Sequence, residues 1–203
     1  MKKQVVVIHG GDAFATYEEY IDFLKNFDIE YDPQKESKKS WKRNLSEDLG
    51  DDYEIISPRM PNSYNAKYIE WKIWFEKYIP YIRDGVVFVG HSLGGIFLAK
   101  YLSEEDYPKV IRGTLLVAAP YDTDENGDRP IVEFNLPHSL EKFEKQGGSL
   151  FLYHSEDDSI VSYTELDKYR KQLPSAIVQT FTNRNHFFDE HFPELVADVK
   201  KLA

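Results

Sequence analysis

Six short runs of apolar residues, most of them rich in β-branched side chains, recur along this chain. They lie at residues 5–8, 53–56, 86–89, 114–117, 150–153 and 177–181. Most are continuous rather than alternating, which is typical of strands buried on both faces of a parallel sheet. Segments with helical spacing of apolar residues fall between them, at 13–26, 65–82, 95–102, 164–172 and 194–202. This alternation predicts an α/β fold with a doubly wound, mainly parallel sheet of about six strands flanked by helices.

Length and composition narrow the class of protein further. The 203 residues, of which 41% are hydrophobic, suffice for one domain with a full core, which we expect to span residues 1–203. The formal net charge of −10 argues against nucleic-acid binding, which requires a basic face. The absence of cysteine excludes disulfides, thiol catalysis and thiolate metal sites. No apolar run is long enough for a signal peptide or a membrane span, so we expect a cytoplasmic protein without membrane contact.

The sequence Gly-His-Ser-Leu-Gly at residues 90–94 lies between a strand-like run and a helix-like segment. It matches the nucleophile-elbow pattern, in which a strand turns directly into a helix and exposes a strained serine, here Ser92. Small residues are needed two positions before and after the serine because the two backbones approach closely. A glycine-rich turn with a helix-capping serine is the alternative. The flanking strand-like and helix-like segments favour the elbow.

A serine hydroxyl needs a base, and the base needs an orienting acid. On an elbow scaffold both follow the serine, first the acid and then the histidine. The acidic cluster after the run 150–153 offers Asp157 and Asp158, and we prefer Asp158 because Val161 gives the Asp-x-x-Val spacing of such acid loops. These acids could also simply begin a helix, where the dipole favours them.

The base is expected among six histidines. His186 stands in a polar turn after the last strand-like run, where side chains of an α/β site gather. His191 is the second choice, but its position close to the final helix suggests a surface residue. His91 is too near Ser92 along the chain to reach its hydroxyl, and His154 could support the acid.

The tetrahedral intermediate of acyl transfer needs two hydrogen-bond donors. One is expected to be the backbone N–H of Leu93, directly after the serine. The other should come from the loop after the first strand, where Gly11 and Asp12 are both candidates and Gly11 is preferred. A phosphate-binding loop is disfavoured at this place, because the glycine pattern of neither nucleotide motif is present.

Two stretches depart from the alternation. Residues 30–52 are strongly charged with both signs mixed, and we expect a solvated helix with loops rather than a basic docking patch. Residues 121–146 are expected to form a long loop and then a helix from about Ser139. This loop is a candidate partial lid. Its alternating acids resemble the start of a calcium loop, but the glycine and the closing carboxylate are misplaced.

At this point the chain resembles the α/β-hydrolase superfamily. The similarity rests on His9-Gly10 after the first strand, the elbow at 90–94, the Asp158-x-x-Val161 loop and His186-Phe187, which together span the chain. Small size, a minimal cap and the segment 58–62 resemble the small serine-hydrolase group of YdeN-type proteins and retinoblastoma-binding protein 9. The resemblance implies Ser92 as nucleophile, Asp158 as acid and His186 as base, with Leu93 and the loop of Gly10 and Gly11 forming the oxyanion hole. It implies no cofactor, and no metal site is expected.

The sequence therefore predicts a serine hydrolase that acts on an ester, thioester or amide carbonyl of a small substrate through an acyl-enzyme. One alternative is a protein-interaction module that keeps the fold but turns over little. Another is different chemistry on the same scaffold, such as hydrolysis of a carbon–carbon bond or acyl transfer to an alcohol. The sequence contains no feature that identifies a protein partner.

Overall fold

The computed structural model describes residues 1–29, 40–124, 129–130 and 132–202. Within them six strands form one sheet in the order β2-β1-β3-β4-β7-β8, and all neighbouring pairs are parallel. The strands are β1 (Lys3–Ile8), β2 (Tyr53–Ile56), β3 (Val86–His91), β4 (Ile111–Val117), β7 (Ser149–Ser155) and β8 (Ile177–Phe181). The predicted six-stranded parallel sheet is therefore confirmed. The two strands missing from this order, β5 (Thr123–Asp124) and β6 (Arg129–Pro130), form a separate antiparallel pair.

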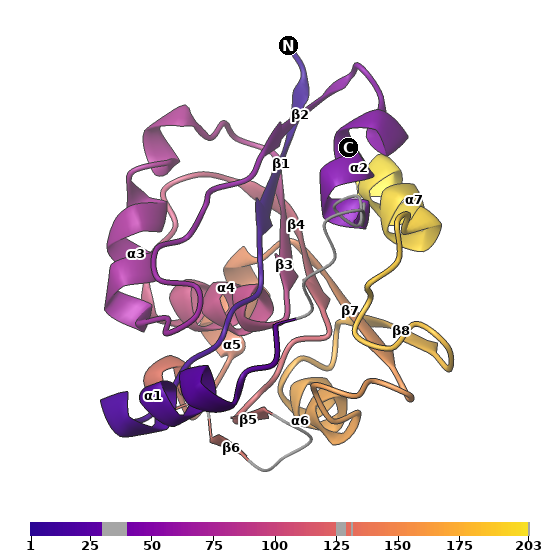
Figure 1. Ribbon diagram of the computed structural model, residues 1–203. Coiled ribbons are helices and arrows are strands. Elements are labelled where there is room, and N and C mark those ends of the chain that lie inside the picture. Colours follow the sequence, from indigo (N-terminus) through magenta and orange to yellow (C-terminus); the bar gives the residue numbers. More distant parts are fainter. Residues whose placement is uncertain (30–39, 125–128, 131, 203) are drawn as a thin grey trace.

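Helices cover both faces of the sheet, as a doubly wound fold requires (Figure 1). One face carries α3 (Tyr68–Glu76), α4 (Leu93–Glu104), α5 (Glu141–Gln146) and α6 (Thr164–Gln172). The other carries α2 (Trp41–Leu49) and α7 (Pro193–Leu202), which lie side by side. The remaining helix, α1 (Tyr17–Asn26), lies near the carboxyl ends of the strands and contains no buried residue. No helix in the described part of the chain is long and apolar enough to cross a bilayer.

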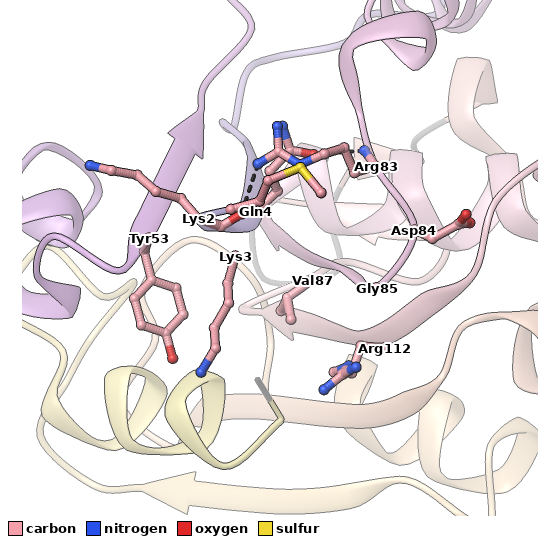
Figure 2. Close-up of a pocket in the computed structure, with 10 residues that line it drawn as sticks. Lys2, Lys3, Gln4, Tyr53, Arg83, Asp84, Gly85, Val87 and Arg112 are labelled. Atoms are coloured by element: carbon pink, nitrogen blue, oxygen red, sulfur yellow. Dashed lines mark hydrogen bonds between the residues drawn. The ribbon is translucent and has the colours of Figure 1, made fainter.

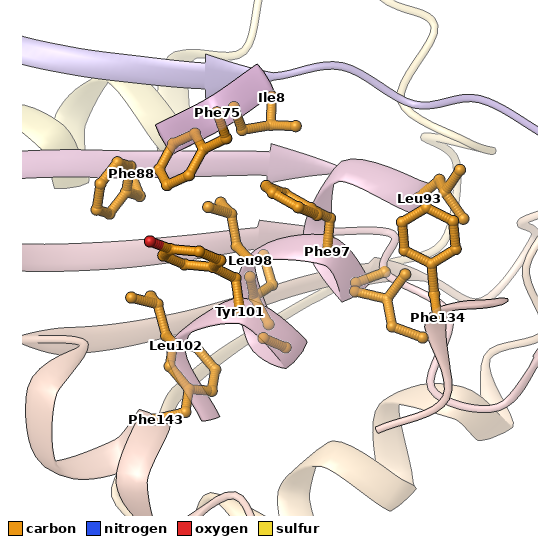
Figure 3. Packing of buried hydrophobic residues seen from close by; sticks show 14 of the residues in the cluster. Ile8, Phe75, Phe88, Leu93, Phe97, Leu98, Tyr101, Leu102, Phe134 and Phe143 are labelled. Carbon is orange, nitrogen blue, oxygen red and sulfur yellow. The ribbon is translucent and has the colours of Figure 1, made fainter. Parts of the chain in front are cut away.

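The larger of two hydrophobic clusters lies under α3 and α4, and its centre is aromatic (Figure 3). Phe75 meets Phe88 and Phe97 edge-on, with ring centroids 5.8 and 5.6 Å apart, and meets Tyr101 at 5.0 Å. Edge-to-face pairs of this kind add to the stabilisation that burial alone provides. The rings fix α4 on the sheet, and α4 begins directly after Ser92.

The neighbouring strands β1 and β3 connect onwards in opposite directions along the sheet, β1 to β2 and β3 to β4. The next helix packed on the sheet after β1 is α2, on the face of α7, whereas α4 follows β3 on the other face. Such a topological switch point opens a crevice at the carboxyl ends of the two strands. Gly10 follows β1 and Ser92 follows β3, so both stand at this crevice.

Two predicted helices differ from their observed bounds for identifiable reasons. The helix expected at 13–26 begins only at Tyr17, because the Thr16 hydroxyl accepts a hydrogen bond from Glu19 N (3.1 Å) and caps it there. The helix expected at 65–82 ends at Glu76. A separate 3₁₀ turn, η1 (Ile79–Tyr81), follows and contains Pro80. A proline inside a helix would remove a backbone donor and clash with the preceding turn.

The helix expected within residues 30–52 is present as α2, but the expectation that it is solvated was wrong. Helix α2 is amphipathic and buries Trp41, Leu45 and Leu49 against α7 and β2. The high charge of the segment obscured this pattern, because polar residues fill every position between the three apolar ones. Residues 30–39, which carry Lys35, Lys38 and Lys39, lie outside the described part of the chain.

The stretch 121–146 matches its prediction where it is described. The loop leads through β5, β6 and the 3₁₀ turn η3 (Val132–Phe134) to α5, which begins at Glu141, two residues after the expected start. Phe134 is fully buried and packs edge-on against Trp71, with ring centroids 5.4 Å apart. Residues 125–128 and 131 lie outside the described residues, so the proposed partial lid stays a prediction.

Candidate active site

Ser92 has the backbone conformation expected of a nucleophile elbow. Its φ of 54° and ψ of −126° are sterically unfavourable for a residue with a Cβ, and its N–H donates to Val117 O at 2.8 Å. Neighbouring glycines permit the close crossing of strand and helix, since a Cβ on Gly90 would lie 2.5 Å from Gly94 O. The strain is held by the packed elements on either side, which favours a functional role for the serine.

Asp158 and His186 form a buried pair at the same edge of the sheet. The carboxylate of Asp158, with a fully buried side chain, accepts hydrogen bonds from Ile160 N (2.8 Å) and Val161 N (2.9 Å). The Nδ1 of His186 lies 2.9 Å from Asp158 Oδ2 and 3.1 Å from Oδ1. Because an ionised carboxylate can only accept, Nδ1 of His186 carries the proton and Nε2 is the ring nitrogen that can accept one.

Asp157, the other candidate acid, points elsewhere and has a different partner. Its Oδ1 accepts from the Ser155 hydroxyl (2.5 Å) and from Asn185 N (3.0 Å), and the Ser155 hydrogen bond lowers the pKa of the carboxyl. Asp157 therefore connects the loop after β7, which carries Asp158, to the loop after β8, which carries His186, rather than contacting the imidazole. We call these two segments the acid loop and the histidine loop. This geometry favours Asp158 as the acid.

The histidine loop is held in an unusual backbone conformation. Asn185 and Phe187, on either side of His186, both have positive φ values, 45° and 55°. The amide oxygen of Asn185 accepts from His186 N (2.7 Å) and from the Ser159 hydroxyl (2.9 Å), so one side chain joins both loops. Asparagine tolerates this region better than most residues, which explains its presence at the turn.

His91 links the elbow to the histidine loop from below. Its Nε2 lies 2.9 Å from the His186 carbonyl oxygen, so it donates there, and its Nδ1 lies 3.1 Å from Nζ of Lys42. Burial is the largest cause that lowers the pKa of His91 well below its usual value, so the ring is neutral. His91, which the sequence did not favour as the base, therefore supports the loop that carries His186.

Sequence reasoning missed the contribution of α2 to this region. Trp41 donates from its indole to Phe187 O (3.0 Å) and from its backbone to Asp189 O (2.9 Å), and Lys42 reaches His91. A tryptophan at the start of a strongly charged segment was the signal that could have revealed this contact. Tryptophan is rarely left in water without a reason.

The two candidate oxyanion donors after β1 differ in availability. Asp12 N already donates to Ser63 O at 2.8 Å, whereas Gly11 N makes no hydrogen bond within the described part of the chain. Leu93 N, at the first turn of α4, likewise has no acceptor among those residues. This difference favours Gly11 over Asp12. A side chain could not replace the hydrogen here, because a Cβ on Gly11 would lie 2.5 Å from Ser63 O.

The remaining histidines near the site have structural partners. His9 lies 2.6 Å from Gly10 O through Nδ1 and accepts from Met60 N (2.9 Å) through Nε2, while His154 contacts Val161 O at 3.0 Å. Burial lowers the pKa of both rings. His191 is paired with Asp48 on the surface, away from Ser92. In the residues that the structure describes, no three histidine or carboxylate side chains converge closely enough for a metal ion.

The sheet order, the strained serine after β3 and the paired carboxylate and histidine after β7 and β8 define the layout of an α/β-hydrolase. A family model described as serine hydrolase matches residues 33–191, and the chain belongs to that family. Serine hydrolase RBBP9 of Rattus norvegicus is 24% identical over 150 residues, which cover 74% of this chain and 78% of that protein.

Solved structures agree on the fold. The ydeN gene product of B. subtilis superimposes with a TM-score of 0.73 at 18% identity, covering 99% of this chain and 98% of that one. A YdeN-like hydrolase of Pectobacterium atrosepticum gives a TM-score of 0.67 at 12% identity, covering 99% and 90%. The predicted α/β-hydrolase fold and the resemblance to the small serine-hydrolase group are confirmed.

Proposed function

We propose that this hydrolase is of the carboxylesterase type and cleaves an ester, thioester or amide bond of a small substrate. Ser92 is the nucleophile, His186 the general base and Asp158 the acid that orients the imidazole. The observation that carries the proposal is the hydrogen-bonded pair of Asp158 and His186 at the sheet edge where Ser92 stands in a strained elbow.

In the first half of the reaction, the Ser92 oxygen forms a bond to the substrate carbonyl carbon, and its proton passes to Nε2 of His186. The carbonyl oxygen becomes an oxyanion, which accepts hydrogen bonds from the N–H groups of Leu93 and Gly11. Asp158 stabilises the imidazolium that forms. The bond to the leaving group then breaks, His186 returns the proton to it, and an acyl-enzyme remains.

In the second half, a water molecule attacks the acyl carbon while His186 takes one of its protons. The tetrahedral intermediate collapses, the Ser92 oxygen regains the proton, and the carboxylic acid leaves. Each step needs only groups that already stand at the carboxyl edge of the sheet. The expectation that no cofactor takes part follows from this scheme and stays a prediction.

A fluorophosphonate probe tests the proposal directly, because it forms a covalent bond with an activated serine. We expect labelling of the wild-type protein at Ser92 and loss of labelling in Ser92→Ala. Ser103→Ala is the matched control, since that hydroxyl donates to Ala99 O within α4 and lies outside the site. A folded wild-type protein that stays unlabelled, or a Ser92→Ala variant that is still labelled, would show the mechanism to be wrong.

The alternative of an interaction module with little turnover predicts no labelling and slow hydrolysis across a panel of esters. The internally satisfied pair of Asp158 and His186 argues against it, because an idle site has no need of an oriented imidazole. Transfer to an alcohol or cleavage of a carbon–carbon bond would leave labelling intact. Product analysis separates these reactions from hydrolysis.

A further inference from the structure

The ammonium group of Lys42 lies beside the residue that precedes the nucleophile. Helix α2 carries it there, and the contacts of Trp41 with the histidine loop hold the start of that helix in place. Lys42 Nζ donates to His91 Nδ1 at 3.1 Å. That ring nitrogen is 3.5 Å from where a Cβ on Gly10 would stand, so Lys42 lies between the loop after β1 and the histidine loop.

Among the residues that the structure describes, no carboxylate is paired with this lysine. In the described part of the chain, several other partly buried lysines form ion pairs, namely Lys67, Lys72, Lys100 and Lys168. Lys42 forms none with the described residues, although in the full sequence acidic residues outnumber basic ones by 35 to 25. Its contacts are the neutral His91 ring and the face of Trp41, 5.2 Å from the nitrogen. Burial without a compensating charge lowers the pKa of Lys42 to about 8.

A second cation, the exposed Arg59, stands next to a residue that contacts His9. Arg59 precedes Met60, whose N–H donates to His9 Nε2, and the charges of Lys42 and Arg59 both lower the pKa of His9 after the larger effect of burial. His9 immediately precedes Gly10, which lies against Ser92. Two positive charges therefore converge on the loop that we place at the oxyanion hole.

From this arrangement we infer that the enzyme selects substrates that carry a carboxylate, which Lys42 binds and Arg59 attracts. The inference rests on the proposed function, because it places the anion relative to an acyl group on Ser92. An ammonium has three donors, and only one is used by His91. A substrate carboxylate would accept the others and supply the charge partner that this partly buried cation lacks.

Matched pairs of esters test the inference with charge on either side of the scissile bond. The pair 4-acetoxybenzoate and its neutral methyl ester tests charge on the leaving group. The pair mono-4-nitrophenyl adipate and 4-nitrophenyl hexanoate tests charge on the acyl group. We expect kcat/KM to favour the charged ester in at least one pair by about tenfold. Lys42→Met should abolish that preference while changing kcat/KM for the neutral ester much less.

A control must separate contact with Lys42 from the general electric field of the protein. A cavity of about 430 Å³ at the amino ends of the strands is lined by other cations, including Lys3, Arg83 and Arg112 (Figure 2). It lies at the edge of the sheet opposite Ser92. Arg112→Gln removes one charge there, as Lys42→Met does at the site, and we expect it to leave the preference intact.

Three outcomes would overturn the inference: no preference for the charged ester in either pair, an unchanged preference in Lys42→Met, or an equal loss in Arg112→Gln. Circular dichroism and thermal unfolding establish that each variant is folded. Labelling of Ser92 by the fluorophosphonate probe distinguishes failure of the inference about Lys42 from failure of the proposed function. If labelling and turnover of neutral esters persist without charge preference, only the role of Lys42 is wrong.

Discussion

The two sides of Ser92 differ in how their polar groups are satisfied. On the side of β7 and β8, the charged group and the hydrogen-bond donors have partners within the protein. Asp158 accepts from two backbone N–H groups and from His186, and Asn185 joins both loops. Even Glu165, a carboxylate buried behind this side, accepts from Tyr121 N and Asp122 N. We call this the closed side, because these polar groups are satisfied within the protein.

The side of β1 and α2 is open by comparison. Gly11 and Leu93 each keep a backbone N–H without an acceptor in the described residues, and Lys42 keeps a charge without a counter-charge there. Buried donors and charges left in this state cost free energy unless a ligand supplies the partner. This difference agrees with the proposed function, in which the first side orients the base and the second side binds the substrate.

We expect the largest effect from a substitution at the centre of the closed side. Asp158→Asn keeps the shape but removes the charge that fixes the Nδ1–H tautomer of His186, so kcat should fall by roughly 10³- to 10⁴-fold. Asp157→Asn is the matched control, since its carboxylate contacts the histidine loop backbone and not the imidazole. Ester hydrolysis by the two purified variants decides the matter. An equal loss in both would remove the distinction between the adjacent acids.

The closed side was largely predictable from sequence, and the open side was not. The sequence predicts Ser92, Asp158 and His186 as site residues because each follows a strand-like run in the order that an elbow scaffold requires, and strand ends converge in a parallel sheet. Lys42 could not be found in this way. Its position depends on how α2 packs against α7 and the histidine loop, and nothing local in a charged segment records that long-range contact.

The same limit applied to the choice between donors after β1. Gly11 and Asp12 are equivalent by position along the chain, and only the fold shows that Ser63 O accepts from Asp12, while Gly11 N has no acceptor among the described residues. Hydrogen bonds between distant loops are set by tertiary packing. Sequence periodicity predicted the strands, and so it predicted where the loops begin, but not which of their amides are already used.

A smaller effect is expected at Asn185, which joins the two loops of the closed side. Asn185→Gly accommodates the positive φ of 45° but deletes the oxygen that accepts from His186 N and Ser159. We expect kcat to fall about tenfold, because the imidazole is less well oriented, while KM changes little. Asn183→Gly, in the same loop, lacks these contacts and should keep nearly full activity. Steady-state kinetics with one neutral ester compares them, and equal losses would refute the orienting role.

The preference for a charged substrate on the open side should depend on pH, because the pKa of Lys42 is lowered to about 8. Lys42 is charged in the free enzyme below its pKa of about 8, whereas burial lowers the pKa of the neighbouring His9 and His91 and keeps both rings neutral. The preference in kcat/KM for a carboxylate-bearing ester should therefore be full near pH 7 and decline several-fold as pH rises through about 8. The ratio of charged to neutral ester, measured from pH 6.5 to 9.5, cancels pH effects on the acyl-transfer steps that the two esters share. A flat ratio would contradict the assignment.

The smallest effect is thermodynamic and depends on no substrate. Folded Lys42 releases its proton near pH 8, but the unfolded chain keeps it until the ordinary lysine value of 10.5. Between these values the unfolded state binds more protons, so the free energy of unfolding should rise with pH. We expect the wild type to gain about 1 kcal/mol relative to Lys42→Met from pH 7.5 to 10, after allowance for partial solvent screening. Urea titrations measure this difference, and Lys171→Met, an exposed lysine on α6, should show none of it. Parallel curves for wild type and Lys42→Met would mean that the Lys42 charge is not buried, and that the open side carries no unmet charge.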